Sequence, residues 1–229
     1  MRSLFGSLVV MTAVAAAAAS PQNPPAVANG TDVYHVLFAK AAPGQAAALA
    51  KALVTPDKTA PMPDHFVVLR HQEGDDWDFA LIAHLGAKAE VVGTPAAANP
   101  ARDLIAWHND TFASGPSWAE FTKQMGGGTN PVFVVGVHRA VAGHREQLLA
   151  ALNAATAGAS KIETGNVLMQ HIEGGDWNFL TLTRYNSWQD LGSERGTLAA
   201  GGSPGGWADL RQHSAFHRDT ITDRIYPAK

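Results

Sequence analysis

The chain has 229 residues, 46% of them apolar, and its 17 basic and 20 acidic side chains give a net charge of −3 with neutral histidines. This weakly acidic balance gives no basic surface for nucleic acid, and the absence of cysteine excludes a disulfide framework. The length and apolar content are sufficient for one large domain or two small ones with a core of their own.

The first residues predict an export signal. Arg2 is followed by an uncharged stretch, Leu4 to Ala19, that ends in Ala17-Ala18-Ala19. This pattern is typical of a secretory signal peptide, and it is short and alanine-rich for a membrane span of about 20 apolar residues. We predict a signal peptide over residues 1–19, a flexible lead-in over 20–30, and a periplasmic or secreted mature protein without a membrane segment.

The sequence contains an internal duplication. "HQEGDDWDF", His71–Phe79, returns as "HIEGGDWNF", His171–Phe179, and "HNDT" at 108–111 resembles "HRDT" at 217–220. The segments "VYHVLFAKAAPGQAAALAKAL" and "VFVVGVHRAVAGHREQLLAAL" match in the same order. Matched blocks in one order indicate two copies of a structural unit. We predict repeat 1 over 31–125 and repeat 2 over 131–229.

Each repeat has the pattern β-α-β-β-α. The predicted strands are 33–39, 65–71 and 77–85 in the first repeat and 132–138, 165–171 and 177–185 in the second, and the first helices are 43–54 and 143–156. A second helix, ending in "WHNDT" or "FHRDT", is expected to close each repeat. Residues 218–226 fit a strand or a helix extension. The order is that of a split β-α-β, ferredoxin-like unit.

Two such units in one chain resemble the dimeric α/β-barrel superfamily, which includes antibiotic-biosynthesis-type monooxygenases, stress-responsive barrel proteins and the haem-binding chlorite dismutase group. The resemblance rests on the order of elements over most of the mature chain. It implies an α+β fold in which two antiparallel sheets face each other and enclose a cavity, as a pseudo-dimer within one chain.

The repeated motif is interpreted mainly as a structural turn. Gly74 and Gly174 supply positive φ in a hairpin loop, and Asp76 and Asp176 can bond nearby backbone amides. The two tryptophans restart the strand and can close the edge of the sheet. The alternative is a metal or proton-transfer site built from Glu73 with Asp76 or His71.

The motif also predicts the register and the faces of the hairpin strands. It places Leu69 opposite Ala80, Val67 opposite Ile82, Met169 opposite Leu180 and Val167 opposite Leu182. This apolar face is expected to lie under the helices, and the opposite face, which mixes aromatic and hydrogen-bonding groups, is expected to line the cavity. The predicted ligand-binding residues are His35, Arg70, His138, Gln170, Thr181, Thr183 and Tyr185.

Ten histidines and no cysteine leave imidazole and carboxylate as the ligands for any transition metal. His213 and His217 are spaced i, i+4 and are weak metal candidates if they share a helix face. The alternative is a pair of helix-end histidines bonded to Asp110 or Asp219. Nucleophile-elbow, Walker and Rossmann motifs are absent from the sequence.

Three functions fit these patterns. The first is an exported small-molecule-binding protein with a barrel cavity. The second is an enzyme of the cofactor-free oxygenase or haem-dependent type, with His35, His138 or Arg70 near the substrate or haem. The third is a structural or interaction module. The ligand, the cofactor and the choice between a monomeric pseudo-dimer and a homodimer are left open by the sequence.

Overall fold

The structure is a computed structural model that describes residues 30–60, 62–87, 101–127, 130–157, 162–199 and 207–227. The predicted signal peptide over 1–19 lies outside these residues and stays a prediction, together with the export it implies. None of the described helices is long and apolar enough to cross a membrane.

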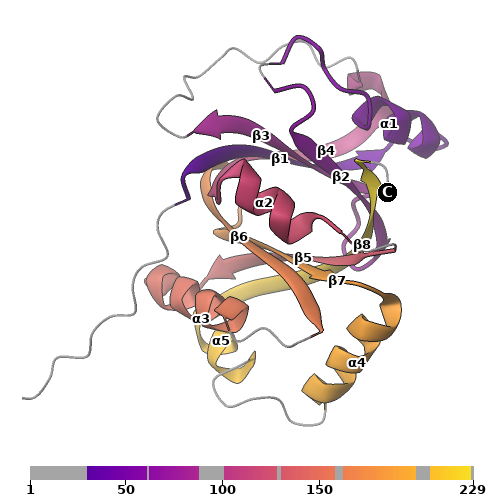
Figure 1. Ribbon diagram of the computed structural model, residues 1–229. Helices are drawn as coiled ribbons and strands as arrows, with labels where there is room; N and C mark the ends of the chain where they lie inside the picture. The colour runs from indigo at the N-terminus through magenta and orange to yellow at the C-terminus, as the bar shows by residue number, and fades with distance from the viewer. Residues whose placement is uncertain are drawn as a thin grey trace, which may run out of the picture.

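The described residues form a closed antiparallel barrel. Its strands are β1 (Asp32–Ala41), β2 (Phe66–Glu73), β3 (Phe79–Ala87), β4 (Ile105–Gly115), β5 (Val132–Ala140), β6 (Glu163–Gly174), β7 (Phe179–Tyr185) and β8 (Ser214–Tyr226). The helices are α1 (Ala46–Leu53), α2 (Trp118–Met125), α3 (Arg145–Ala157), α4 (Trp188–Ala199) and α5 (Trp207–His213), with a 3-10 turn, η1 (Arg102–Leu104). Figure 1 shows α1 beside the first-half strands and α3, α4 and α5 beside the second-half strands.

The last strand of each half joins the two halves into one barrel, because it pairs with a strand of its own half and with a strand of the other half. The strand order is β1-β3-β2-β8-β5-β7-β6-β4. In this order β4 pairs with β1 of its own half and with β6, while β8 pairs with β5 of its own half and with β2. The predicted α+β fold with two ferredoxin-like halves facing each other is therefore confirmed.

The helix predicted to close each repeat is wrong. "WHNDT" lies within β4 and "FHRDT" within β8, which also settles residues 218–226 as strand. The inward-facing positions here are Thr111, Thr220 and Thr222, all essentially fully buried. Buried threonines do not stand out as apolar, so the two-residue alternation of a strand was hidden in the sequence.

The predicted register is correct, and the assignment of its faces is inverted. Val67 pairs with Ile82, Leu69 with Ala80, Val167 with Leu182 and Met169 with Leu180. These side chains join one buried cluster drawn from both halves, which is the barrel interior. The opposite face, with Phe66, Val68 and Phe79, packs against Leu49 and Leu53 on α1. Both faces are apolar, so alternation shows which residues share a face but not which face lies inside.

The space between the halves is filled rather than open in the described part of the chain. Interior residues from both halves pack together, and α2 adds the fully buried Phe121 and Met125 to the same cluster. Figure 1 shows α2 lying across the barrel between the strands of the two halves. Its first turn is anchored at the backbone N–H of Trp118, which donates to Asp32 at 3.0 Å. The predicted cavity between the two sheets is therefore replaced by an apolar core.

The repeated hairpin motif fastens one half to the other. Gly74 and Gly174 adopt φ of 130° and 111°. A Cβ on Gly74 would lie 2.6 Å from the carbonyl oxygen of Asp219, and one on Gly174 would lie 2.2 Å from that of Asp110. Each hairpin tip thus presses on the last strand of the other half, which only glycine permits.

The other polar positions of the motif hold the hairpin to its own half. The Asp76 carboxylate pairs with Lys40 at 3.5 Å, and that of Asp176 pairs with Arg139 at 3.0 Å, in place of the expected bonds to backbone amides. Trp77 and Trp177 are buried in the barrel interior rather than at an edge. The described residues contain no group of three side chains able to hold a metal ion. The structural interpretation of the motif is the one these contacts support.

Candidate functional site

The predicted ligand-binding residues lie on the outer face of the sheets. In the second half this face is covered by helices: Tyr185 and Val134 pack with Leu191 of α4. Phe179 packs with side chains of α3 and α5 in a second buried cluster. The predicted residues of the second half therefore lie between sheet and helices, rather than between the two sheets.

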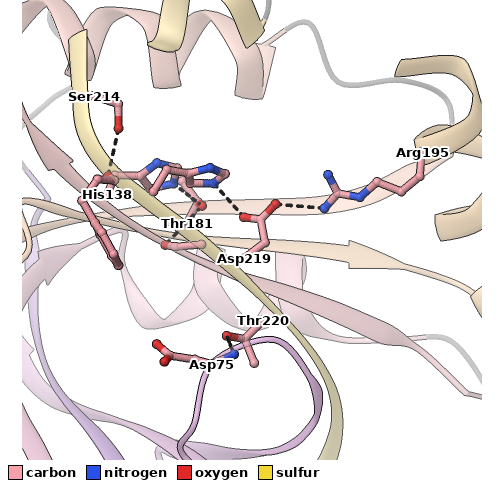
Figure 2. Close-up of polar contacts among 10 residues, drawn as sticks. Asp75, His138, Thr181, Arg195, Ser214, Asp219 and Thr220 are labelled. Carbon is pink, nitrogen blue, oxygen red and sulfur yellow. Dashed lines mark hydrogen bonds and ion pairs between the residues drawn. The ribbon is translucent and has the colours of Figure 1, made fainter. Parts of the chain in front are cut away.

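Three neighbouring strands and one helix bring a polar cluster together on this face, shown in Figure 2. His138 on β5 is hydrogen-bonded to Thr181 on β7, with 2.9 Å between Nε2 and Oγ1. His217 on β8 stacks on the His138 ring, with centroids 4.6 Å apart and planes inclined by 17°. The Nε2 atom of His217 lies 2.8 Å from Asp219 Oδ1, and Arg195 from α4 donates to Asp219 Oδ2 at 3.0 Å.

Gly136 allows these groups to converge. It pairs with Thr181 on one side and with Asp219 on the other. A Cβ at this position would lie 2.4 Å from Thr181 Oγ1, 2.9 Å from His138 Nε2 and 3.1 Å from Asp219 Oδ1. Any larger residue would separate the imidazole, the hydroxyl and the carboxylate.

The charges in the cluster are set by burial and by partners. Burial, with the neighbouring His217, lowers the pKa of His138 to about 3, so this imidazole is neutral at physiological pH. Burial opposes ionisation of Asp219, but the bonds from His217 and Arg195 hold the pKa of its carboxyl below the ordinary value. The cluster is a neutral imidazole stacked on a second imidazole that is paired with a charged carboxylate.

The described residues of the first half form no such cluster. Its strand pairing places Ala39 opposite His108, where the second half has His138 opposite His217. Asp110 corresponds to Asp219 and bonds to His35 at 2.7 Å and to His108. These side chains are partly exposed to solvent, His108 by 57%. The structure therefore does not bring His35 to His138.

The remaining predicted residues are dispersed. Arg70 makes a two-pronged ion pair with Asp223, at 3.1 and 2.7 Å, beside an open groove of about 280 Å³. Thr183 lies opposite Val134, and Gln170 lies opposite Phe179 and Ser114. Of the seven predicted residues, His138 and Thr181 are joined by a hydrogen bond.

Tyr185 belongs to a second polar cluster that adjoins Arg195. Its hydroxyl donates to the carboxylate of Glu194, and Glu163 accepts from Asn166 Nδ2 at 3.1 Å. Burial, together with the hydrogen bond to Glu194, raises the pKa of Glu163 to about 7. Burial likewise raises the pKa of Tyr185. The carboxyl of Glu163 therefore gains and loses its proton near neutral pH.

Glu163→Gln is expected to make the protein more stable at pH 8 than the wild type, by about 1–2 kcal/mol after allowing for partial exposure. The folded pKa lies above its ordinary value of 4.5, so wild-type stability from this group falls as pH rises from about 4.5 to 7. The variant should lack this fall. Denaturant unfolding at pH 5 and pH 8 measures the difference.

Glu120→Gln is the control for this experiment. The pKa of Glu120 is held below its ordinary value by bonds from Gln124 and Lys123, so its removal should give no gain in alkaline stability. An equal gain in both variants, or a parallel pH dependence for Glu163→Gln and wild type, would refute the assignment of the raised pKa to Glu163.

The shared helix face that would make His213 and His217 a metal pair does not form. His213 ends α5, while His217 lies on β8. His213 Nδ1 bonds to His144 Nδ1 at 3.0 Å. His217 and Asp219 do bond to each other, but on a strand rather than at a helix end. The sequence did not single out Asp219 or Arg195 as site residues; the repeated His-x-Asp of "HNDT" and "HRDT" was the available signal.

A haem group, implied by part of the resemblance, does not fit His138. Its Nε2 is bonded to Thr181, its Nδ1 is buried, and the imidazole ring packs against that of His217. An iron atom and its porphyrin would have to displace these contacts.

Neither protein-family models nor curated proteins give a match to this sequence. Solved structures do. An anthrone oxidase-like protein aligns with a TM-score of 0.58 and 11% identity, over 87% of this chain and 93% of that protein. A proposed monooxygenase of Fusobacterium nucleatum subsp. nucleatum aligns with a TM-score of 0.57 and 8% identity, over 86% and 93%. A proposed monooxygenase of Lactobacillus acidophilus NCFM aligns at 0.52 and 7%, over 85% and 94%.

What these proteins share with this chain is the fold. The alignments span nearly the whole of each neighbour, so both halves of the barrel correspond. The identities are too low to carry residue roles across. Any activity has to be argued from the side chains present here.

Proposed function

We propose that this chain is an oxygenase that acts with dioxygen on a small molecule bearing an acidic C–H or phenolic O–H group. The observation that carries the proposal is the His217–Asp219–Arg195 arrangement stacked on His138, on a helix-covered sheet face. The descriptions of the structural neighbours as anthrone oxidase-like and proposed monooxygenases support this choice over a pure binding protein.

His217 is the proton acceptor in this proposal. A carboxylate bonded to one ring nitrogen fixes the tautomer of an imidazole and stabilises its protonated form. Arg195 keeps Asp219 charged and in place. Removal of a proton from the substrate by His217 leaves an electron-rich anion, which is the form that can give electrons to dioxygen.

The reaction balances with dioxygen as the oxidant. A CH₂ group beside an aromatic carbonyl loses two hydrogens, one oxygen atom enters the product as a new carbonyl, and the other leaves as water. The dioxygen is reduced and the substrate carbon is oxidised. The proton taken by His217 is returned to the departing oxygen.

His138 and Thr181 position the reacting groups. The low pKa of His138, about 3, keeps its ring uncharged beside His217. A neutral neighbour avoids the repulsion that a second cation would exert when His217 takes up a proton. The bond to Thr181 fixes the orientation of the ring.

The proposal is tested by oxygen uptake. The purified protein is mixed with enolisable aromatic ketones and electron-rich phenols, and dissolved oxygen and product mass are followed. We expect consumption of one dioxygen per product, with a mass gain of one oxygen minus two hydrogens. Saturable binding of these compounds with no oxygen consumption would instead support the small-molecule-binding function predicted first from the sequence.

We propose that the mature chain begins after residue 19 and works as a monomeric pseudo-dimer, because each half supplies the last strand that completes the other's sheet. N-terminal sequencing of the secreted protein and its mass in solution test these two points.

A further inference from the structure

Two polar atoms of the repeated hairpin motif have no explanation in the contacts described above. In the first half these are Nε2 of His71 and Nε1 of Trp77; in the second half they are the same atoms of His171 and Trp177. All four nitrogens are buried and have no hydrogen-bond partner within the described part of the chain. The tryptophans themselves are 2% and 3% exposed.

The two nitrogens of each half belong to neighbouring rings. The His71 and Trp77 rings meet edge to face with centroids 5.9 Å apart, and those of His171 and Trp177 do the same at 5.8 Å. The interplanar angles are 60° and 71°. The same pair of unpartnered atoms in the same arrangement has therefore been kept in both copies.

Buried polar groups are almost always hydrogen-bonded, because leaving one unsatisfied is destabilising. A second buried histidine of the barrel, His84, meets this requirement. His84, 7% exposed, has Nε2 bonded to Asp32 at 2.8 Å and Nδ1 bonded to His65 at 3.1 Å. Among the described residues His138 Nδ1 and Arg224 Nε are also buried without a partner, but the four nitrogens of the motif differ from these in forming two matched pairs.

We infer that each half holds one buried water molecule between the histidine Nε2 and the tryptophan Nε1 of its hairpin motif. An indole N–H only donates, whereas a histidine nitrogen can accept. Water fits both roles, because its oxygen accepts from the tryptophan while one of its hydrogens is donated to the histidine. An oxygen about 2.9 Å from each nitrogen spans a gap of up to about 5.8 Å.

These sites explain why the motif carries a histidine. The glycine, the aspartate and the tryptophan ring of the motif each have a structural role. None of the contacts by which the hairpin fastens the two halves requires an imidazole. A bridging water needs at least two polar partners to be held in an apolar interior. His71 and His171 provide the second partner, and the inference is independent of the proposed oxygenase function.

The test is a crystal structure of the wild-type protein at a resolution that shows ordered water, grown in a bromide-containing solution. We expect one water peak in each half, about 2.7–3.2 Å from both nitrogens, and no anomalous bromide signal there. A peak in neither half or in only one, or nitrogens bonded to protein atoms, overturns the inference. A bromide signal overturns it too, since the occupant would be an anion.

A solution experiment uses the duplication as its own control. In ¹⁵N-labelled protein, the indole N–H protons of Trp77 and Trp177 should each show a cross-peak to a long-lived water. Trp177→Phe removes the donor in the second half only, so the Trp77 cross-peak should persist and the second-half water should disappear from the crystal. Retention of that water in the variant would show that Trp177 does not hold it.

Discussion

Gly174→Ala is expected to lower the free energy of unfolding by about 3 kcal/mol or more. The added Cβ would lie 2.2 Å from the carbonyl oxygen of Asp110 and 2.8 Å from Cα of Thr111. Both are backbone atoms of the paired strand β4, so neither can swing aside. The φ of 111° adds strain of its own, because residues other than glycine rarely adopt such an angle.

Gly143→Ala is the matched control. Gly143 also has a positive φ, 81°, but a Cβ there would meet nothing within 4 Å. Its cost should be confined to backbone strain, about 1 kcal/mol. Urea denaturation of the two variants measures the difference, and equal losses would show that the hairpin tip does not press on the other half. A larger loss at Gly174 assigns the repeated motif its role as the fastening between halves.

Asp219→Asn is expected to lower kcat/KM for the oxidised substrate by about 10²- to 10⁴-fold. Asparagine keeps the shape of the side chain but removes the charge that stabilises a protonated His217. It also breaks the ion pair with Arg195, now 3.0 Å long. Because His217 would lose both its orientation and its counter-charge, most of the loss should lie in kcat.

Asp110→Asn tests whether this loss belongs to the second half. Asp110 occupies the equivalent position of the first half and bonds to His35 and His108, whereas Asp219 bonds to His217 and Arg195. It has no neighbour equivalent to His138, because Ala39 stands at that position. We expect less than about a threefold change in kcat/KM. Comparable losses in both variants, with both proteins folded, would place the chemistry elsewhere or in both halves.

The repeat is what made most of the fold predictable from sequence. Matching His71–Phe79 with His171–Phe179 gave the hairpins, their register and the pseudo-dimeric arrangement. The inside of the barrel could not be deduced in the same way, because Val67 and Leu69 on one face and Phe66 and Val68 on the other are equally apolar. Which face is buried by helices depends on contacts between distant segments.

The candidate site was predictable only in part for a related reason. His138 and Thr181 were found because alternation along β5 and β7 places them on one face. Asp219 and Arg195 were not found. Asp219 lies on β8, which pairs with β5 only after a long connection, and the position of Arg195 depends on how α4 packs against the sheet. The inward-facing threonines of β8 are not apolar, so the alternation typical of a strand was hard to recognise there. The sequence near His217 therefore did not predict that it lies beside His138.

The position at which the substrate binds tests the proposed reaction site most directly. A compound that supports oxygen uptake is titrated under argon into protein with ¹⁵N-labelled histidines, and the imidazole signals are followed by NMR. We expect the signals of His138 and His217 to move on binding while those of His35 and His108 stay in place. Movement of the first-half signals, with those of His138 and His217 unchanged, would contradict a reaction site on the second-half sheet.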